Sequence, residues 1–447
     1  IMKCASAFSI QHSTFSIQHS APRPAPLISA MFNQDVMTYR LTGAWQIQVR
    51  VNSIEVTLEV TPQKRCQVQD EYHASVQEYN PKAGGYARGT VLRGVKADKC
   101  STRYAFVPDS LTVKLAEPPH DTLQSGRDFQ LEPEWGNIGC LPGGRLAAQQ
   151  PVLCSYQHTK QRLDAIVKTK DGNIVLRQGV PHVCLPVPPP LEDGDTHLAN
   201  VFIDVTTTAL TDDLIFPILE KAFPEPPRTT PTPAEQLLPK TVARLKSGQP
   251  LRILAWGDSV TCGSFVDEQD RWQCQFVRRL QQAFPGAVIE LLTEAWDGRS
   301  TGSYLQEPPG SIHNYQEKVL DLKPDLVISE FVNDAGTAPE IICDRYQKLH
   351  QDFTAIGAEW IILTPHYVRP DWMGLTSQKN IDADPRPYVK TIRKLAADNG
   401  IALADAALRH GRLWRQGIPY NTLMTNAINH PNAAGLKLFA DALIALF

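Results

Sequence analysis

Short apolar runs alternate with helical patterns along the second half of the chain. In the helical stretches, apolar residues recur every three or four positions, as Trp272, Phe276 and Leu280 do. We expect strands at 253–256, 288–295, 326–331, 360–364 and 401–404. We expect helices at 272–284, 315–322 and 339–356, after Pro387, and at 433–447. This alternation predicts an α/β fold over residues 248–447, with a doubly wound parallel sheet covered on both faces.

The first half of the chain shows a two-residue period instead. Apolar residues occupy alternate positions in 45–51 and 54–60, and Asn52 and Ser53 form a turn between them. Further short strands are expected at 104–107, 111–115, 166–167, 174–176 and 198–205. No helical pattern of useful length appears before residue 212. The sequence therefore predicts an all-β, sandwich-like domain over 39–210, whose aromatic residues fill the core or line a carbohydrate-binding face.

Two segments lie outside these domains. Residues 1–38 contain the sequence FSIQHS twice, at 8–13 and 15–20, before a proline-rich run, and we expect a disordered low-complexity segment. Residues 211–247 contain the run FPEPPRTTPTP, which is typical of a linker because repeated proline interrupts helices and sheets. A short amphipathic helix is expected at 234–247.

Composition narrows the class of protein. The net charge is −3 over 447 residues, which gives no reason to expect nucleic acid as a partner. No apolar run reaches the length of a membrane span, and the first thirty or so residues lack the apolar core of a signal peptide, so we expect a cytoplasmic location. None of the nine cysteines has Cys-x-x-Cys spacing, and we expect free thiols, no metal site and no cofactor.

Four polar clusters follow predicted strands or precede the last helix. They are Asp258 with Ser259, WDGR at 296–299, VND at 332–334 and NHPN at 429–432. In a parallel sheet such positions meet at the carboxyl edge, where binding sites form. In the stretch LRILAWGDSVTCG, at 251–263, Gly257 permits a tight turn that would place Ser259 at a helix N-terminus. Thr261 excludes the Gly-x-Ser-x-Gly elbow of α/β-hydrolases.

These residue types suit acyl transfer, which needs a nucleophile, a base and donors aimed at a developing oxyanion. Ser259 is the candidate nucleophile and His430 the candidate base. The side-chain amide of Asn333 and the backbone N–H groups of Gly298 and Ser259 are the candidate oxyanion donors. The order Ser, Gly, Asn, His resembles the four blocks of the SGNH, or GDSL-like, hydrolases over about residues 250–447. The resemblance implies flavodoxin-like strand order and a serine esterase.

The sequence departs from the resemblance at one place. The SGNH family usually has Asp three residues before the histidine, where this chain has Ala427. Asn426 and Asn429 are the nearest polar residues, and either amide oxygen is a candidate acceptor for the imidazole Nδ1–H. A backbone carbonyl or a carboxylate from elsewhere in the chain are the alternatives.

Several other residues have supporting roles in this interpretation. Asp258 is expected to brace the loops rather than to react. Together with Asp334 and with His366, which ends the fourth strand, it is a candidate for supporting the site or binding substrate. Arg299, His313 and Arg386 are candidates for binding a polar substrate or for surface roles. Asp382 and Asp384 are interpreted as solvated loop residues.

The sequence thus predicts a serine esterase that acts on a small-molecule or carbohydrate ester, with acetyl as the expected acyl group. The β domain favours a carbohydrate only by analogy. Two alternatives use the same fold. An SGNH-type O-acyltransferase would use the same residues while excluding water, and a non-catalytic binding protein would have kept the fold alone.

Overall fold

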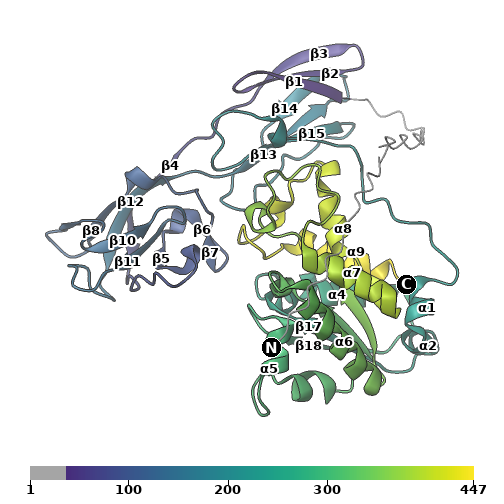
Figure 1. The fold of residues 1–447 in the computed structure, drawn as a ribbon. Coiled ribbons are helices and arrows are strands. Elements are labelled where there is room, and N and C mark those ends of the chain that lie inside the picture. The colour runs from purple at the N-terminus through teal and green to yellow at the C-terminus, as the bar shows by residue number, and fades with distance from the viewer. Residues whose placement is uncertain (1–36) are drawn as a thin grey trace, which may run out of the picture. The chain divides into compact units, whose positions relative to one another are not determined.

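The structure, a computed structural model, describes residues 37–447 (Figure 1). The tandem FSIQHS copies and nearly all of the segment predicted to be disordered lie outside the described residues. Residues 37–447 fall into an N-terminal region of antiparallel sheets and a C-terminal region that alternates strands and helices. Both predicted fold classes are therefore confirmed.

The C-terminal region is built on one parallel sheet of five strands. These are β17 (Leu251–Gly257), β18 (Ile289–Ala295), β19 (Leu326–Glu330), β20 (Glu359–Leu363) and β21 (Ala402–Ala404). Their order in the sheet is β18-β17-β19-β20-β21, so the chain switches direction next to β17. This is the flavodoxin-like order, and it places the carboxyl ends of β17, β18 and β19 side by side at the point where ligands bind in such sheets.

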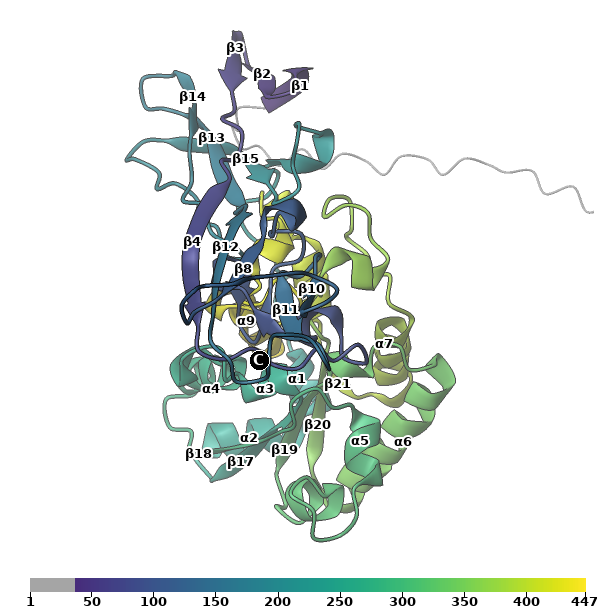
Figure 2. The same cartoon turned by 90° about the vertical axis from the view of Figure 1, so that its left-hand side faces the viewer.

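Helices cover both faces of the parallel sheet (Figures 1 and 2). They are α3 (Ser259–Cys262), α4 (Trp272–Ala283), α5 (Thr301–Gln306), α6 (Pro339–Ala355), α7 (Pro387–Asn399), α8 (Ala406–Gly411) and α9 (Ala433–Ile444). Parallel strands are joined by right-handed crossovers, so the reversal at β17 puts α4 and α9 on one face and α6 and α7 on the other. A single π-helical turn, Gln316–Leu320, stands where a helix is predicted at 315–322.

The strand before the nucleophile turn is held rigidly. The side chain of Trp256 in β17 is fully buried and packs edge-on against Phe331 and Tyr304, with ring centroids 4.8 Å and 5.3 Å apart. Aromatic contacts of this kind add to the free energy gained by burial. The carboxyl end of β17 is therefore held by aromatic packing within the core of the sheet.

The N-terminal region consists of short strands in several antiparallel sheets. Their strands are β1 (Met37–Gly43), β2 (Gln46–Val51), β3 (Ile54–Glu59), β4 (Cys66–His73), β5 (Thr90–Val91), β6 (Lys96–Ala97), β7 (Cys100–Ser101), β8 (Thr112–Leu115), β9 (Thr122–Leu123), β10 (Phe129–Glu132), β11 (Asn137–Cys140), β12 (Val152–His158), β13 (Arg162–Lys168), β14 (Ile174–Arg177), β15 (Thr196–Ile203) and β16 (Ile215–Pro217).

These sheets enclose two separate cores rather than one. The sheet β1-β2-β3 and the sheet β14-β13-β15-β16 share the first core. The sheet β4-β12-β8-β9 and the sheet β10-β11-β5 share the second core. Strands β4, β12 and β8 are labelled next to one another in Figure 2. Each core resembles a small sandwich, because apolar side chains from two sheets face one another.

Three further differences from the predicted elements concern residues 104–107, the end of the β region and the helix expected at 234–247. Residues 104–107 form a loop, because Tyr104 adopts a left-handed backbone with φ of 64° that no strand permits. The sheet continues to Pro217 through β16. The predicted helix at 234–247 is two helices, α1 (Pro233–Leu237) and α2 (Pro239–Ser247), because Pro239 lacks an N–H and disfavours helical geometry in the preceding residue.

Candidate active site

The turn after β17 presents Ser259 as the first residue of α3. Gly257 is required there, because a Cβ at this position would lie 2.1 Å from Thr261 Oγ1 and 2.4 Å from the Glu330 carbonyl oxygen. Asp258 is the N-cap of α3, and its Oδ1 accepts from the Val260 N–H (3.0 Å). Ser259 N–H begins the helix, where no intrahelical acceptor exists, so it is available to an external oxyanion.

His430 meets Ser259 from the loop that precedes α9. The distance from His430 Nε2 to Ser259 Oγ is 3.2 Å, and both side chains are almost fully buried. The ring of Phe265 stacks on the imidazole, with centroids 4.4 Å apart and an interplanar angle of 12°. Asn432 caps α9 by accepting from the Gly435 N–H (3.0 Å), which fixes the end of the loop. The imidazole is therefore held within hydrogen-bond reach of the hydroxyl.

Asn333, on the loop after β19, is hydrogen-bonded to Asp258, the residue before the candidate nucleophile Ser259. The backbone N–H and the side-chain Nδ2 of Asn333 both donate to Asp258 Oδ2, at 3.0 Å and 2.8 Å. An amide nitrogen carries two N–H donors, so one N–H of Asn333 is left for an oxyanion. Burial raises the pKa of Asp258 to about 7, although the three donated hydrogen bonds favour the carboxylate. Asp258 thus braces α3 against the loop after β19.

Asp334 ties this loop to the segment that follows Gly298. Its carboxylate accepts from the backbone N–H of Thr301 (3.1 Å), from the Thr301 hydroxyl (2.9 Å) and from the Tyr346 hydroxyl (3.0 Å). Burial raises the pKa of Asp334 to about 6. Gly298 itself has a φ of 71°, and a Cβ there would meet nothing within 4 Å. The Gly298 backbone therefore borders open space at the carboxyl edge of the sheet.

The second nitrogen of His430 contacts a residue that sequence reasoning did not single out. His430 Nδ1 lies 2.9 Å from Asp98 Oδ2, and Asp98 comes from the N-terminal β region. Neither Asn426 nor Asn429, the two predicted acceptors, contacts the ring. The Asn426 carbonyl Oδ1 accepts from the backbone N–H groups of Ile428, Asn429 and His430, and its Nδ2 donates to Asn429 Oδ1.

The prediction for Asn426 and Asn429 is therefore corrected. The side chain of Asn426 stabilises the turn of its own loop, because its Oδ1 accepts hydrogen bonds from three successive backbone N–H groups. It is therefore not directed at the imidazole. The alternative of a carboxylate from elsewhere in the chain is the one that matches the structure. The sequence carried no local signal for Asp98, which is 332 positions from His430.

Burial lowers the pKa of His430 below its ordinary value, and the hydrogen bond and charge of Asp98 oppose that effect. Lys99 lowers the pKa further and Asp297 raises it. The net result is a neutral imidazole at neutral pH, which is the form that accepts a proton from a hydroxyl.

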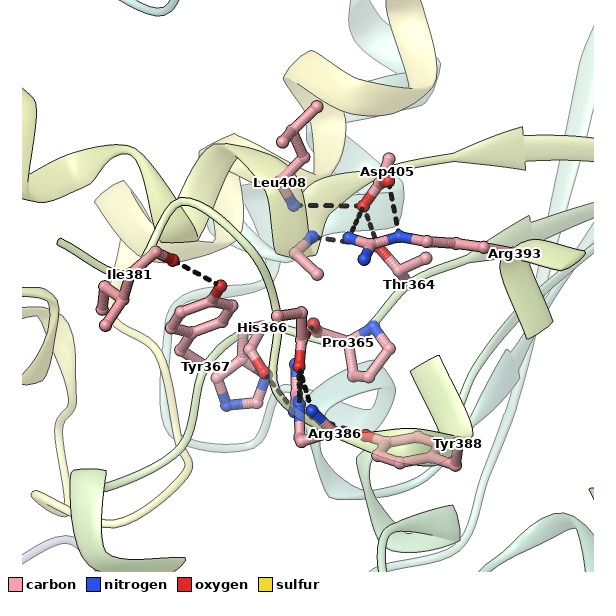
Figure 3. Close-up of polar contacts among 12 residues, drawn as sticks. Thr364, Pro365, His366, Tyr367, Ile381, Arg386, Tyr388, Arg393, Asp405 and Leu408 are labelled. Atoms are coloured by element: carbon pink, nitrogen blue, oxygen red, sulfur yellow. Dashed lines mark hydrogen bonds and ion pairs between the residues drawn. The ribbon is translucent and has the colours of Figure 1, made fainter. Parts of the chain in front are cut away.

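His366 lies inside the protein rather than at the rim (Figure 3). Arg386 donates to the carbonyl oxygens of His366 (2.8 Å) and Pro365 (3.0 Å), and its guanidinium pairs with Asp384 (2.6 Å). The side chain of His366 is fully buried, and burial lowers its pKa well below the ordinary value. Arg386 and Asp384 form a buried ion pair, which corrects their interpretation as surface or solvated residues.

A second ion pair anchors the start of the same loop. Arg393 on α7 pairs with Asp405 (2.8 Å), and Asp405 accepts from the Thr364 hydroxyl (3.0 Å) (Figure 3). Asp382, also predicted to be solvated, accepts from the indole N–H of Trp414 (2.7 Å) and pairs with Arg415. The loop after β20 is thus a structural support for the site.

Arg299 and His313 lie around a half-buried indole. The guanidinium of Arg299 lies 5.0 Å above the ring of Trp296, and the imidazole of His313 stacks on that ring at 4.6 Å. His313 Nδ1 also contacts Glu294 Oε1 (2.7 Å). Arg299 is exposed to solvent, whereas the imidazole of His313 is held by its contacts with Trp296 and Glu294.

The described residues also bear on three further properties, namely metal binding, membrane spanning and disulfide bonding. Among residues 37–447, no group of three or more His, Cys, Asp or Glu side chains is placed to hold a metal ion. None of the helices in that range is long and apolar enough to cross a membrane. The eight cysteines located there are free thiols.

A flavodoxin-like sheet with Ser259, Gly298, Asn333 and His430 at one edge defines an SGNH-type hydrolase fold. Residues 255–438 match the model of the GDSL-like lipase/acylhydrolase family, so this part of the chain is similar to that family. No curated protein sequence matches the chain.

Solved structures with a similar fold include three carbohydrate esterases. A two-domain esterase active on acetylated mannans is 18% identical, with 47% of this chain and 53% of that chain covered and a TM-score of 0.38. The acetylxylan esterase Axe2 from Geobacillus stearothermophilus is 16% identical, with 44% and 94% covered and a TM-score of 0.36. The acetyl xylan esterase AlAXEase is 22% identical, with 43% and 98% covered and a TM-score of 0.34. The match thus spans about half the length of the two-domain esterase.

Proposed function

We propose that the chain is a serine ester hydrolase in which Ser259 is the nucleophile and His430 the general base. The observation that carries the proposal is the 3.2 Å contact between His430 Nε2 and Ser259 Oγ, at the carboxyl edge of the parallel sheet. A nucleophile, a base in contact with it and oxyanion donors together are the minimum for acyl transfer.

In this mechanism Ser259 Oγ attacks the ester carbonyl carbon while His430 Nε2 takes the hydroxyl proton. The carbonyl oxygen becomes an oxyanion, which the N–H groups of Ser259, Gly298 and Asn333 stabilise. Collapse of the tetrahedral intermediate breaks the bond to the alcohol oxygen, and His430 returns the proton to that oxygen. Water then attacks the acyl-enzyme by the same steps, with His430 again as base, and releases the carboxylic acid.

The substrate that we propose is an acetyl ester, with a carbohydrate as the alcohol. The exposed groups beside the site are hydrophilic, because Lys99, Asp297 and Arg299 present charges there. The indole of Trp296 offers an aromatic face of the kind on which sugar rings can pack. The mannan and xylan esterases named above suggest which acetylated oligosaccharides to test.

The test is hydrolysis by wild type, Ser259→Ala and Ser247→Ala, with p-nitrophenyl acetate, butyrate and octanoate as substrates. Ser247 is an exposed serine at the end of α2 and serves as the control. We expect Ser259→Ala to lower kcat by about a millionfold and to abolish labelling by a serine-reactive phosphonate, and Ser247→Ala to change neither. Activity of Ser259→Ala within tenfold or so of wild type would contradict the mechanism.

Product analysis separates the remaining alternatives. Release of acetate from acetylated mannan or xylan oligosaccharides, with preference for acetyl over longer esters, is the expected result. Transfer of the acetyl group to an added alcohol, with little acetate formed, would identify an O-acyltransferase instead. Absence of both turnover and phosphonate labelling in the wild type would identify a binding protein.

A further inference from the structure

The loop that carries His430 holds position 427 against apolar side chains of the β region. Ala427, the residue three positions before the histidine, has a φ of 53°. Ala427 packs against the second core of the β region, and the next residue, Ile428, is buried within that core together with Val95 and Cys100. A carboxylate at position 427 would lose its hydration against these apolar groups, which is costly without a partner. The packing of this loop therefore conflicts with the acid that SGNH enzymes place there.

A hairpin of the β region approaches His430 instead. Strands β6 and β7 pair antiparallel, with Ala97 opposite Cys100, so Asp98 and Lys99 form the two-residue tip. Lys99 adopts a left-handed backbone with φ of 55°, which closes the tight turn. The tip thus projects the Asp98 carboxylate beyond the end of its strand, toward His430 Nδ1.

Buried contacts fix this tip against the histidine loop. The Asp98 backbone N–H donates to the Thr425 carbonyl oxygen (3.2 Å), and the Cys100 thiol lies 3.1 Å from the Asn426 carbonyl oxygen. The Cys184 thiol contacts the same Thr425 carbonyl (3.2 Å). Burial raises the pKa of both thiols to about 12, so they stay protonated and act as donors. Since Thr425 N–H in turn donates to the His430 carbonyl (2.7 Å), hairpin and histidine are linked through one short segment.

We propose that Asp98 is the residue that positions His430, and that the N-terminal β region thereby completes the catalytic site of the C-terminal domain. This inference rests on the proposed serine hydrolase function. Asp98 Oδ2 accepts the Nδ1–H at 2.9 Å, which leaves Nε2 unprotonated and directed at Ser259 Oγ. When Nε2 takes the hydroxyl proton, the carboxylate stabilises the imidazolium that forms.

The charged and titratable groups around His430 come from several elements. Asp98 and Lys99 lie on the hairpin tip, Asp297 on the loop after β18, and His366 on the loop after β20. Asp98 raises the pKa of His430 and Lys99 lowers it. Removing the carboxylate of Asp98 therefore lowers the pKa of His430 and shifts the acidic limb of kcat/KM to lower pH.

The experiment compares Asp98→Asn with Asp171→Asn in the full chain, with p-nitrophenyl acetate between about pH 4 and pH 9. Asp171 is an exposed aspartate in the β13–β14 hairpin and is the matched control. We expect Asp98→Asn to lower kcat by about a hundredfold to ten-thousandfold and to slow phosphonate labelling of Ser259. The acidic limb of its kcat/KM profile should move to lower pH. Asp171→Asn should match wild type in kcat and in the position of the acidic limb.

Two results would overturn the role of Asp98. The first is a rate of Asp98→Asn within about threefold of wild type. The second is a large loss of rate with an unmoved acidic limb and a lower unfolding temperature, which would mean that Asp98 only stabilises the hairpin. Either result, with turnover in the wild type that Ser259→Ala abolishes, refutes this inference alone. Turnover that survives Ser259→Ala refutes the proposed function, and this inference with it.

Discussion

The two regions of this chain are built in different ways and contribute unequally to the site. The C-terminal domain has one continuous core and one sheet, and the proposed nucleophile and oxyanion donors follow the carboxyl ends of β17, β18 and β19. The β region has two smaller cores and several strands of only two residues. Its contribution to the site is a single hairpin tip, Asp98 and Lys99.

This difference separates two parts of the proposed mechanism, the stabilisation of the oxyanion and the orientation of His430. Stabilisation of the oxyanion depends on loops that Asp258 and Asp334 fasten to one another within the C-terminal domain. The orientation and charge of His430 depend on both regions, because Asp98 contacts the edge of the imidazole at Nδ1 and Phe265 covers one face of the ring. Variants in the C-terminal domain should therefore change the plateau rate, and variants near the hairpin should change the pH profile.

Asn333→Ala should produce the largest effect within the C-terminal domain. It removes the N–H aimed at the oxyanion, and loss of one such donor typically lowers kcat by about a hundredfold to a thousandfold. KM should change by only about twofold or threefold, since the hydrogen bond strengthens as charge develops on the oxygen. Steady-state kinetics with p-nitrophenyl acetate provides the measurement.

Tyr346→Phe is the control for Asn333→Ala. It removes the hydrogen bond from the Tyr346 hydroxyl to Asp334 (3.0 Å) and so loosens the same buried network without touching the oxyanion. We expect its kcat to fall less than about tenfold, as for a typical single hydrogen bond. An equal loss of kcat in both variants would mean that Asn333 acts by holding the loop, and an effect of Asn333→Ala on KM alone would assign it to ground-state binding.

The C-terminal domain was predictable from sequence for a physical reason. Both faces of its sheet are covered, so the inner strands β17, β19 and β20 are mostly apolar, and the longer helices show a 3.6-residue period. The local rule also explains the site, because residues that follow buried parallel strands must meet at one edge. Ser259, Asn333 and the loop of His430 needed no knowledge of distant contacts to be brought together.

The acid partner was not predictable in this way. Asp98 lies on a two-residue hairpin tip, and its neighbours Lys96 and Lys99 resemble any exposed turn. What brings it to His430 is the docking of Ile428 into the second core of the β region, which is a long-range packing event. Ala427 was the one sequence feature that pointed to an acid from elsewhere in the chain. It shows that the usual aspartate is absent three residues before His430, but it does not identify the residue that replaces it. The split of α1 from α2 at Pro239 was, by contrast, open to local reasoning.

Phe265→Ala should shift the pH profile in the direction opposite to Asp98→Asn. Burial is the largest cause of the lowered pKa of His430, and removing the stacked ring admits water to the imidazole. The charged form gains hydration, so the pKa of His430 rises and the acidic limb of kcat/KM moves to higher pH. Phe284→Ala, whose ring packs on Phe447 at 6.4 Å, is the control and should leave the limb in place. A shift of the limb to lower pH in Phe265→Ala would refute burial as the dominant cause.

Lys99→Ala should have the smallest effect, and it tests what holds the hairpin tip. Lys99 Nζ contacts Ser264 Oγ (3.0 Å) and Asp297 Oδ2 (3.3 Å), but the Lys99 and Asp297 side chains are about half exposed. An exposed ion pair contributes at most about 1 kcal/mol and is screened by salt, so kcat/KM should fall by no more than about fivefold, and less at high salt. Because Lys99 lowers the pKa of His430, its removal should also move the acidic limb slightly to higher pH.

Lys96→Ala, an exposed lysine on β6 of the same hairpin, is the control and should match wild type. If the buried contacts of Asp98, Cys100 and Ile428 fix the tip, loss of Lys99 leaves Asp98 against His430 and only the electrostatic effect remains. A loss of a hundredfold or more in Lys99→Ala would show that the exposed lysine positions the tip. The coupling of the two regions would then depend on surface charge and salt, instead of on the apolar packing around Ile428.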